Sequence, residues 1–135
     1  MKIYIAGKIR EGHEREQLEK IDSLCKSLGH ETFLPHRDAG LCKSIDDVKE
    51  IFNKDISEGM QSIDLVIALL EGLHIGAGTA WELGYAYANK IPSVGLKTDE
   101  LPENALEELS AIILASTQIV TSFEELKNHL IKLKK

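Results

Sequence analysis

Hydrophobic and polar positions follow two alternating patterns along the chain. Short apolar runs, typical of buried strands, occupy residues 2–6, 32–34, 64–70, 93–96 and 118–120. Between them, apolar residues recur at helical spacing over residues 12–28, 44–62, 78–89, 103–114 and 123–133. The run at 64–70 is apolar on both faces, which is typical of a central parallel strand covered by helices on both sides.

Five strands in strict alternation with five helices predict an α/β fold. The expected architecture is a three-layer, doubly wound (flavodoxin/Rossmann-like), five-stranded parallel sheet of order 2-1-3-4-5. In this order, ligands bind beyond the carboxyl ends of the first and third strands, which points to the loops at 7–12 and 71–77. Linkers and long repeats are absent from the sequence, so we expect residues 1–135 to form one domain.

Composition and charge narrow the function classes. The chain has 135 residues, of which 43% are hydrophobic, and a net charge of -6 disfavours a broad nucleic-acid-binding surface. Cys25 and Cys42 are isolated thiols, and the chain shows no leader pattern, so we expect a cytoplasmic protein with reduced cysteines. No apolar run approaches the roughly 20 residues that span a bilayer. The five histidines lack zinc-site spacing, and we predict neither a metal nor a cofactor.

The loop after the first strand concentrates positive charge in an otherwise acidic chain. Gly7 permits a tight turn, and Lys8 and Arg10 precede a helix N-terminus that starts near Gly12. This combination predicts a compact anion site that a phosphate would fit. The alternative is a solvated Lys and Arg, because the loop lacks both dinucleotide and P-loop glycine patterns.

Glu82 is the first candidate catalytic acid. It lies in the predicted opening turn of the helix at 78–89, where the helix N-terminus favours an ionised carboxylate. Gly76 and Gly78, close by, let a ligand approach the backbone. These features suit a nucleophile, whereas the alternative is an acid that only complements the helix dipole.

Asp55 is the second candidate acid, because it lies at the edge of an inward-facing apolar stripe. The stripe includes Val48, Ile51, Phe52, Ile56, Gly59 and Ile63. A carboxylate there is costly unless it is paired or used, and bonding to backbone amides is the alternative. Tyr4, inside a central strand, needs a hydroxyl partner, and a carboxylate at the crevice is a natural one. His36 follows the second strand at the same sheet edge, either lining the site or serving as an ordinary loop residue.

These segments resemble the nucleoside 2-deoxyribosyltransferase family, and more closely its branch of 2'-deoxynucleoside 5'-phosphate N-hydrolases. The resemblance covers most of the chain and is carried by residues 4–10, 54–56, 64–68, 78–84 and 109–113. It implies that Glu82 is the nucleophile, that Asp55 is the acid/base residue, and that Tyr4 hydrogen-bonds the nucleophile.

The resemblance also implies a phosphate site. The residues that correspond to the hydrolase phosphate loop are Gly7, Lys8, Ile9, Arg10, Glu11 and Gly12. Ser110 matches a serine that the hydrolases lend to the phosphate across a homodimer interface. Lys8 replaces the hydrolase serine, and Gly76 stands where transferases have an aspartate and hydrolases a serine. Loss of that negative charge favours a phosphate at the 5' position.

The expected function is therefore hydrolysis of 2'-deoxynucleoside 5'-monophosphates to free base and 2-deoxyribose 5-phosphate through a covalent glycosyl-glutamate. Its partners would be the small-molecule nucleotide and a second copy of the chain, with no nucleic-acid polymer and no membrane. Two alternatives remain, which are a deoxyribosyltransferase that exchanges bases and a nucleotide-binding module without catalysis.

Overall fold

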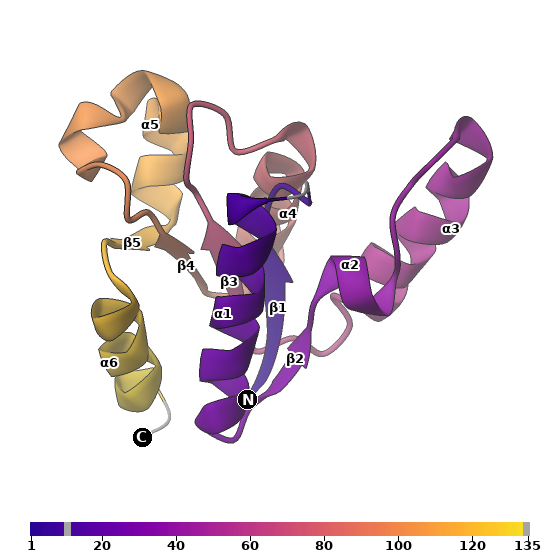
Figure 1. Cartoon of the computed structure of the whole chain (residues 1–135), viewed down its shortest axis with the longest axis horizontal. Coiled ribbons are helices and arrows are strands. Elements are labelled where there is room, and N and C mark those ends of the chain that lie inside the picture. Colours follow the sequence, from indigo (N-terminus) through magenta and orange to yellow (C-terminus); the bar gives the residue numbers. More distant parts are fainter. Residues whose placement is uncertain (10–11, 134–135) are drawn as a thin grey trace.

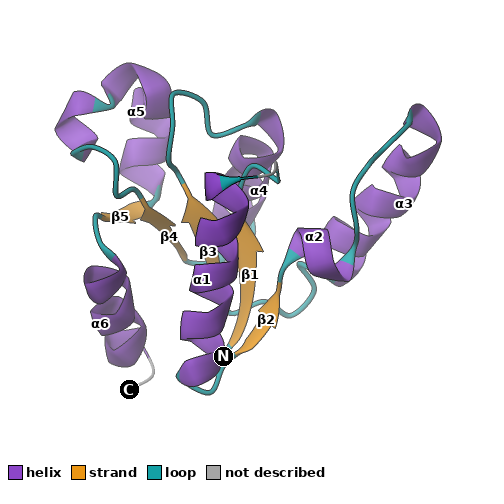
Figure 2. Ribbon diagram, viewed as in Figure 1, coloured by secondary structure: helices purple, strands orange, loops and turns teal. Residues whose placement is uncertain are grey.

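Five parallel strands form one sheet at the centre of the molecule, shown by a computed structural model that describes residues 1–9 and 12–133 (Figures 1 and 2). The strands are β1 (Lys2–Ala6), β2 (Glu31–Phe33), β3 (Leu65–Leu69), β4 (Ser93–Leu96) and β5 (Gln118–Val120). Their order is β2-β1-β3-β4-β5, and every neighbouring pair is parallel. The predicted fold class and strand order are confirmed.

Helices cover both faces of this sheet. The α-helices are α1 (His13–Ser27), α2 (Pro35–Asp38), α3 (Val48–Phe52), α4 (Ala77–Ala88), α5 (Leu106–Ser116) and α6 (Phe123–Leu133). Two 3-10 turns, η1 (Ile45–Asp47) and η3 (Pro102–Asn104), and a π-helical segment, η2 (Asn53–Glu58), complete the set. Buried side chains of α1 and α6 pack in one hydrophobic cluster, and those of α4 and α5 pack in another.

Strand alternation decides which helices each side chain of β1 meets. Ile3 and Ile5 belong to the cluster with α1 and α6, whereas Tyr4 and Ala6 belong to the cluster with α4 and α5. Tyr4 is fully buried in spite of its hydroxyl group. The alternation of side chains along β1 therefore directs the Tyr4 hydroxyl toward α4, the helix that carries Glu82.

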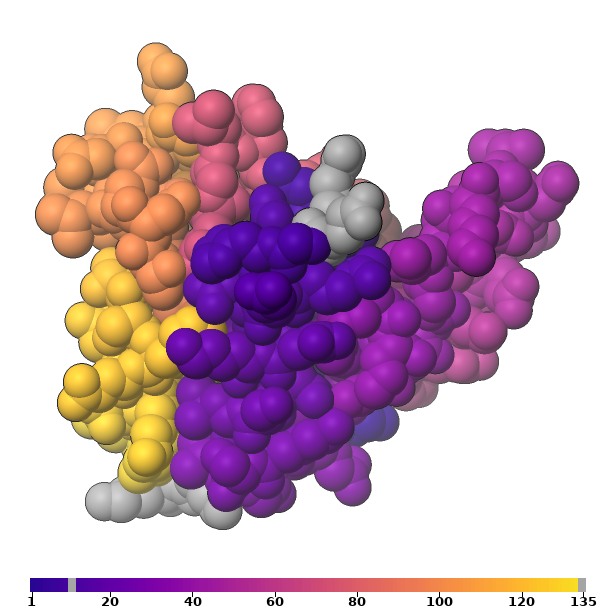
Figure 3. Space-filling model, viewed as in Figure 1, coloured from indigo at the N-terminus to yellow at the C-terminus, as the bar shows by residue number. Residues whose placement is uncertain are grey.

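The prediction of one continuous helix at 44–62 is wrong. The segment divides into η1, α3 and η2, and it projects from the body of the molecule (Figure 3). Val48 and Phe52, expected to face inward, are 45% and 48% exposed. No layer covers this part of the apolar stripe within the described chain, so the stripe lines a cavity instead of a core.

Two other helix predictions also needed correction. The helix predicted at 103–114 starts instead as the 3-10 turn η3, and Ser110, at φ 66° and ψ 149°, interrupts α5. A short helix, α2, follows β2 where no helix was predicted, with Pro35 at its first position. Among the described helices, each is too short or too polar to cross a membrane.

Candidate active site

A cavity of about 1130 Å³ opens beyond the carboxyl ends of β1 and β3. It brings together the two loops expected from the strand order, because residues 7–9 and residues 74, 76 and 77 line it. The remaining lining residues, which come from the projecting segment and from α4, are Gly40, Leu41, Cys42, Val48, Ile51, Phe52, Asp55, Ile56, Gly78, Thr79, Trp81 and Glu82. Both candidate acids therefore face one cavity.

Glu82, which lines this cavity, is in direct contact with the buried Tyr4. The hydroxyl of Tyr4 donates a hydrogen bond to a carboxylate oxygen of Glu82. The Tyr4 ring lies parallel to the ring of Phe33, with 5.3 Å between the centroids and 7° between the planes. Burial and the charge of Glu82 raise the pKa of Tyr4 far above its ordinary value, so Tyr4 acts as a proton donor in this bond.

The electrostatics of Glu82 differ from the sequence expectation. Glu82 lies beyond the first turn of α4, which contains no acidic residue, so the helix N-terminus is too distant to dominate. Burial raises the pKa of Glu82 to about 7, the hydrogen bond from Tyr4 opposes this rise, and the charge of Asp55 adds to it. Desolvation thus outweighs the helix dipole at this acid.

Asp55 extends into the same cavity from the π-helical segment η2. Burial raises the pKa of Asp55 to about 6. Its Oδ1 atom is buried and has no hydrogen-bond partner in the described chain. The alternative, in which backbone amides bind the Asp55 carboxylate, therefore does not hold for Oδ1. This atom is available to accept a hydrogen bond from a ligand.

The charge of Asp55 contributes to the raised pKa of Glu82, so the protonation of Glu82 depends on that of Asp55. With pKa values of about 7 and about 6, the pair holds one proton between these pH values. The order of the two values alone would place this proton on Glu82. The hydrogen bond from Tyr4 lowers the pKa of Glu82, whereas Oδ1 of Asp55 has no donor among the described residues.

Lys8 brings positive charge to the lining of the same cavity and packs against Gly76. A Cβ atom at Gly76 would lie 3.4 Å from Cγ of Lys8, and the backbone of Gly76 has φ 91°, a conformation that favours glycine. Gly12 precedes α1 and is exposed outside the cavity lining. Arg10, the other predicted cation of this loop, lies outside the described residues.

Two predicted site residues lie away from the cavity. The His36 side chain is 7% exposed, and its Nε2 atom lies 3.2 Å from Glu19, so it packs against α1 instead of lining the cavity. Ser110 is exposed on α5, where its Oγ accepts a hydrogen bond from the N–H of Ile112 at 3.1 Å. Within one chain, Ser110 makes no part of the cavity wall.

Buried polar contacts, not anticipated from the sequence, fix the loop after β3. Lys97 is fully buried, donates to the carbonyl oxygen of Leu70 at 3.0 Å and pairs with Asp99 at 2.9 Å. The carboxylate of Glu71 accepts hydrogen bonds from Gln17, at 3.2 Å, and from the hydroxyl of Thr98. A lysine directly after an apolar strand was the available signal, but sequence alone names no partner for it.

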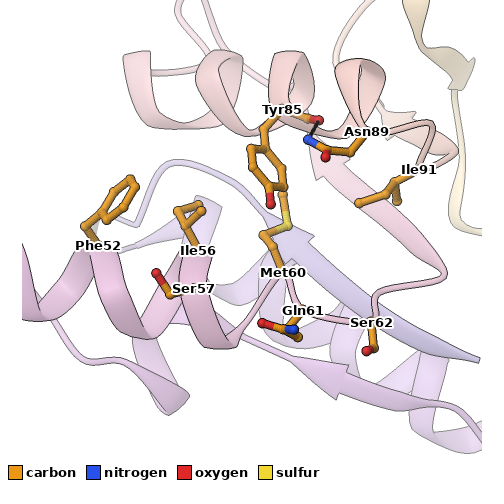
Figure 4. A pocket seen from close by; sticks show the side chains of 9 residues that line it. All are labelled: Phe52, Ile56, Ser57, Met60, Gln61, Ser62, Tyr85, Asn89 and Ile91. Carbon is orange, nitrogen blue, oxygen red and sulfur yellow. Dashed lines mark hydrogen bonds between the residues drawn. The ribbon is translucent and has the colours of Figure 1, made fainter.

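A second, smaller cavity of about 400 Å³ adjoins the first (Figure 4). Phe52 and Ile56 line both cavities, so the helical segment that carries Asp55 separates them. The residues that line only the smaller cavity are Ser57, Met60, Gln61, Ser62, Tyr85, Asn89 and Ile91. Its lining residues in the described chain include no carboxylate, whereas both candidate acids line the larger cavity. No cluster of three potential metal ligands occurs in residues 1–9 and 12–133.

A family model described as nucleoside 2-deoxyribosyltransferase matches residues 3–128. The chain therefore belongs to the nucleoside 2-deoxyribosyltransferase family. This family acts on the N-glycosidic bond of nucleosides, and two half-buried acids in one cavity suit that chemistry. A comparison with curated protein sequences found no match.

Solved structures share the fold at low sequence identity. A 2-deoxyribosyltransferase from Bacillus psychrosaccharolyticus superposes with a TM-score of 0.78 at 22% identity, covering 95% of this chain and 91% of the other. A conserved protein from Enterococcus faecalis V583 gives 0.74 at 28% identity, with 97% of both chains covered. A CMP N-glycosidase from Clostridium botulinum gives 0.56 at 18% identity, with 99% and 98% covered.

Proposed function

We propose that this protein hydrolyses the N-glycosidic bond of 2'-deoxynucleoside 5'-monophosphates to a free base and 2-deoxyribose 5-phosphate. The observation that carries this proposal is a single cavity that is lined by two acids, Glu82 and Asp55, and by the cation Lys8. The acids serve the sugar and the base, and the loop at 7–9 serves the phosphate together with the N-terminal end of α1.

The substrate class follows from the charge on the 5' side of the cavity. Lys8 forms no ion pair with a carboxylate among residues 1–9 and 12–133, and Gly76 presents no side chain beside it. A free 5'-hydroxyl would leave this ammonium group without a counter-ion, whereas a phosphate accepts charge-assisted hydrogen bonds from it. Arg10 and Gly12, in the same loop, are proposed as further phosphate contacts, and Ile9 as a contact to the substrate.

The first half of the reaction forms a covalent intermediate. In the reactive form the single proton of the pair lies on Asp55, and Tyr4 stabilises the charge on Glu82. The ionised carboxylate of Glu82 attacks C1' of the sugar and forms a carbon–oxygen bond. The bond from C1' to the base nitrogen breaks, and its electron pair is protonated by Asp55 as the base departs. Tyr4, bonded to Glu82, holds the attacking carboxylate in place.

The second half returns the enzyme to its starting state. Asp55, now ionised, takes a proton from a water molecule, whose oxygen attacks C1'. The bond between C1' and Glu82 breaks, and its electron pair restores the carboxylate. One proton on the acid pair is therefore enough for both halves of the reaction, which matches the raised pKa values of both acids.

Purified protein incubated with a panel of 2'-deoxynucleoside 5'-monophosphates should release free base and 2-deoxyribose 5-phosphate, measured by chromatography. We expect kcat/KM for a monophosphate to exceed that for the corresponding deoxynucleoside by about tenfold to a hundredfold. The reason is that a charge-assisted hydrogen bond contributes about 1.5–3 kcal/mol. Release of base from none of the substrates, over hours at micromolar enzyme, contradicts the proposal.

The same assay separates hydrolysis from base exchange, the second candidate, which the name of the matching family favours. A second free base, added in excess, accepts the deoxyribosyl group only from a transferase. Formation of a new nucleotide would therefore assign base exchange. Tight monophosphate binding without release of base, seen as a rise in Tm, would assign a binding module instead.

Ser110 is proposed to reach the phosphate of a neighbouring copy in a homodimer. Its exposed position and its left-handed backbone, at φ 66°, leave its hydroxyl at the surface of α5. We expect light scattering to give a dimer, and Ser110→Ala to raise KM for the monophosphate severalfold with the dimer intact. A monomer at assay concentration, or an unchanged KM, would remove this role.

A further inference from the structure

Gly59 directly follows the π-helical segment that carries Asp55. Its N–H donates to the carbonyl oxygen of Lys54 at 2.8 Å, which closes a turn one residue wider than an α-helical turn. Figure 4 shows this helical segment through Phe52, Ile56 and Met60 on the side of the smaller cavity. Turns of this type are frequent at functional sites because they alter the direction of a side chain.

The space around Gly59 is filled on two sides. A Cβ atom there would lie 2.5 Å from the carbonyl oxygen of Asp55 and 2.8 Å from two ring atoms of Phe33. Contacts this short do not persist, so a side chain at position 59 requires both neighbours to move. The backbone of Gly59, at φ -65° and ψ -37°, is ordinary helix, so the requirement is for space alone.

The two residues that crowd Gly59 connect it to both candidate acids. Asp55 is one of those acids, and its own backbone touches Gly59. Phe33 stacks on Tyr4, which donates its hydroxyl hydrogen to Glu82. Gly59 thus lies next to the backbone of Asp55 and next to Phe33, the ring that stacks on the hydrogen-bond donor of Glu82. It lines neither cavity.

We propose that Gly59 is a positioning residue whose missing side chain sets Asp55 and, through Phe33 and Tyr4, Glu82 in their reactive arrangement. This inference rests on the proposed function, since it assigns Gly59 a part in that reaction. Gly59 touches no reacting atom, so its effect is on the rate of the chemical steps and not on phosphate binding.

Gly59→Ala should lower kcat for base release about tenfold or more, while KM for the monophosphate changes less than about threefold. Displacement of a reacting group by an ångström costs rate on this scale or larger. The pH profile of kcat should shift as well, because a displaced Asp55 has a different exposure to solvent. A fall in kcat with an unchanged pH profile would indicate only a smaller folded fraction and would overturn the proposal.

Gly84→Ala is the matched control, because Gly84 lies in α4 and a Cβ atom there meets nothing within 4 Å. It should keep kcat within about twofold of the wild type. Phe33→Leu provides a second test, which removes the ring that supports Tyr4 without changing the turn at Gly59. It should also lower kcat and shift the pH profile, and wild-type values for both in Phe33→Leu would overturn the link to Glu82.

A direct titration separates this inference from the proposed reaction. Carbon-13 NMR of labelled carboxyl groups can follow Asp55 and Glu82 in the wild type, in Gly59→Ala and in Gly84→Ala. We expect both titrations to move in Gly59→Ala alone. If the wild type releases no base, the proposed function fails, and this titration still decides the positioning role. Unchanged titrations in folded Gly59→Ala would overturn that role whatever the activity.

Discussion

Glu82→Gln should slow base release about a thousandfold or more, with the monophosphate still bound. Glutamine keeps the shape of the side chain and can accept the hydrogen bond from Tyr4, but its amide oxygen is not a competent nucleophile toward C1'. The expected loss corresponds to about 4 kcal/mol of transition-state stabilisation. Single-turnover release of base, together with binding measured by calorimetry, checks both parts of this result.

Chemical rescue distinguishes a lost nucleophile from a disturbed cavity. Glu82→Ala leaves room for a small anion, so formate should restore part of the activity by taking the place of the missing carboxylate. Glu103→Gln, which changes an exposed acid in η3, is the matched control and should act like the wild type. Glu82→Gln with near-normal turnover would rule out the covalent route.

Glu82→Gln should also make the protein more stable than the wild type at pH 8, by about 1–3 kcal/mol. Burial raises the pKa of Glu82 from its ordinary value of 4.5 to about 7, so the folded state binds a proton that the unfolded state has lost. Wild-type stability therefore falls as pH rises from about 4.5 to about 7. The variant has no acid at this position and does not share this fall.

Thermal unfolding at several pH values measures this effect. The Tm of Glu82→Gln should exceed that of the wild type by roughly 3–10 °C at pH 8, and the difference should disappear below about pH 4.5. Glu31→Gln, at an exposed position of β2, should show no such pH-dependent gain. A variant less stable than the wild type at pH 8 would mean that the ionised Glu82 stabilises the fold.

The sheet was predictable from the sequence because strand and helix periodicities differ. Apolar runs such as residues 64–70 mark central strands, and the strand order then selects the loops that meet at the crevice. The lining of one cavity by residues 7–9 and by His74 and Gly76 followed from that order. The contact between Tyr4 and a carboxylate followed from a hydroxyl inside an apolar strand.

Other parts of the site depend on contacts that no local pattern specifies. The break of the helix at 44–62 into η1, α3 and η2 leaves no signature in apolar spacing, because Val48 and Ile51 suit a cavity wall as well as a core. The pKa of Glu82 depends on burial by distant segments, so the helix dipole alone was misleading. His36 lies at the expected sheet edge but packs against Glu19 of α1.

The contact between Lys8 and Gly76 makes these two positions mutually dependent. A side chain at Gly76 would meet the lysine stem at 3.4 Å and would also have to adopt a backbone angle of φ 91°. Because the two positions touch, we expect the effects of replacing both to deviate from the sum of the single effects. An engineer who wishes to redirect specificity at the proposed 5' end would have to redesign the pair, and the neighbouring turn, as one unit.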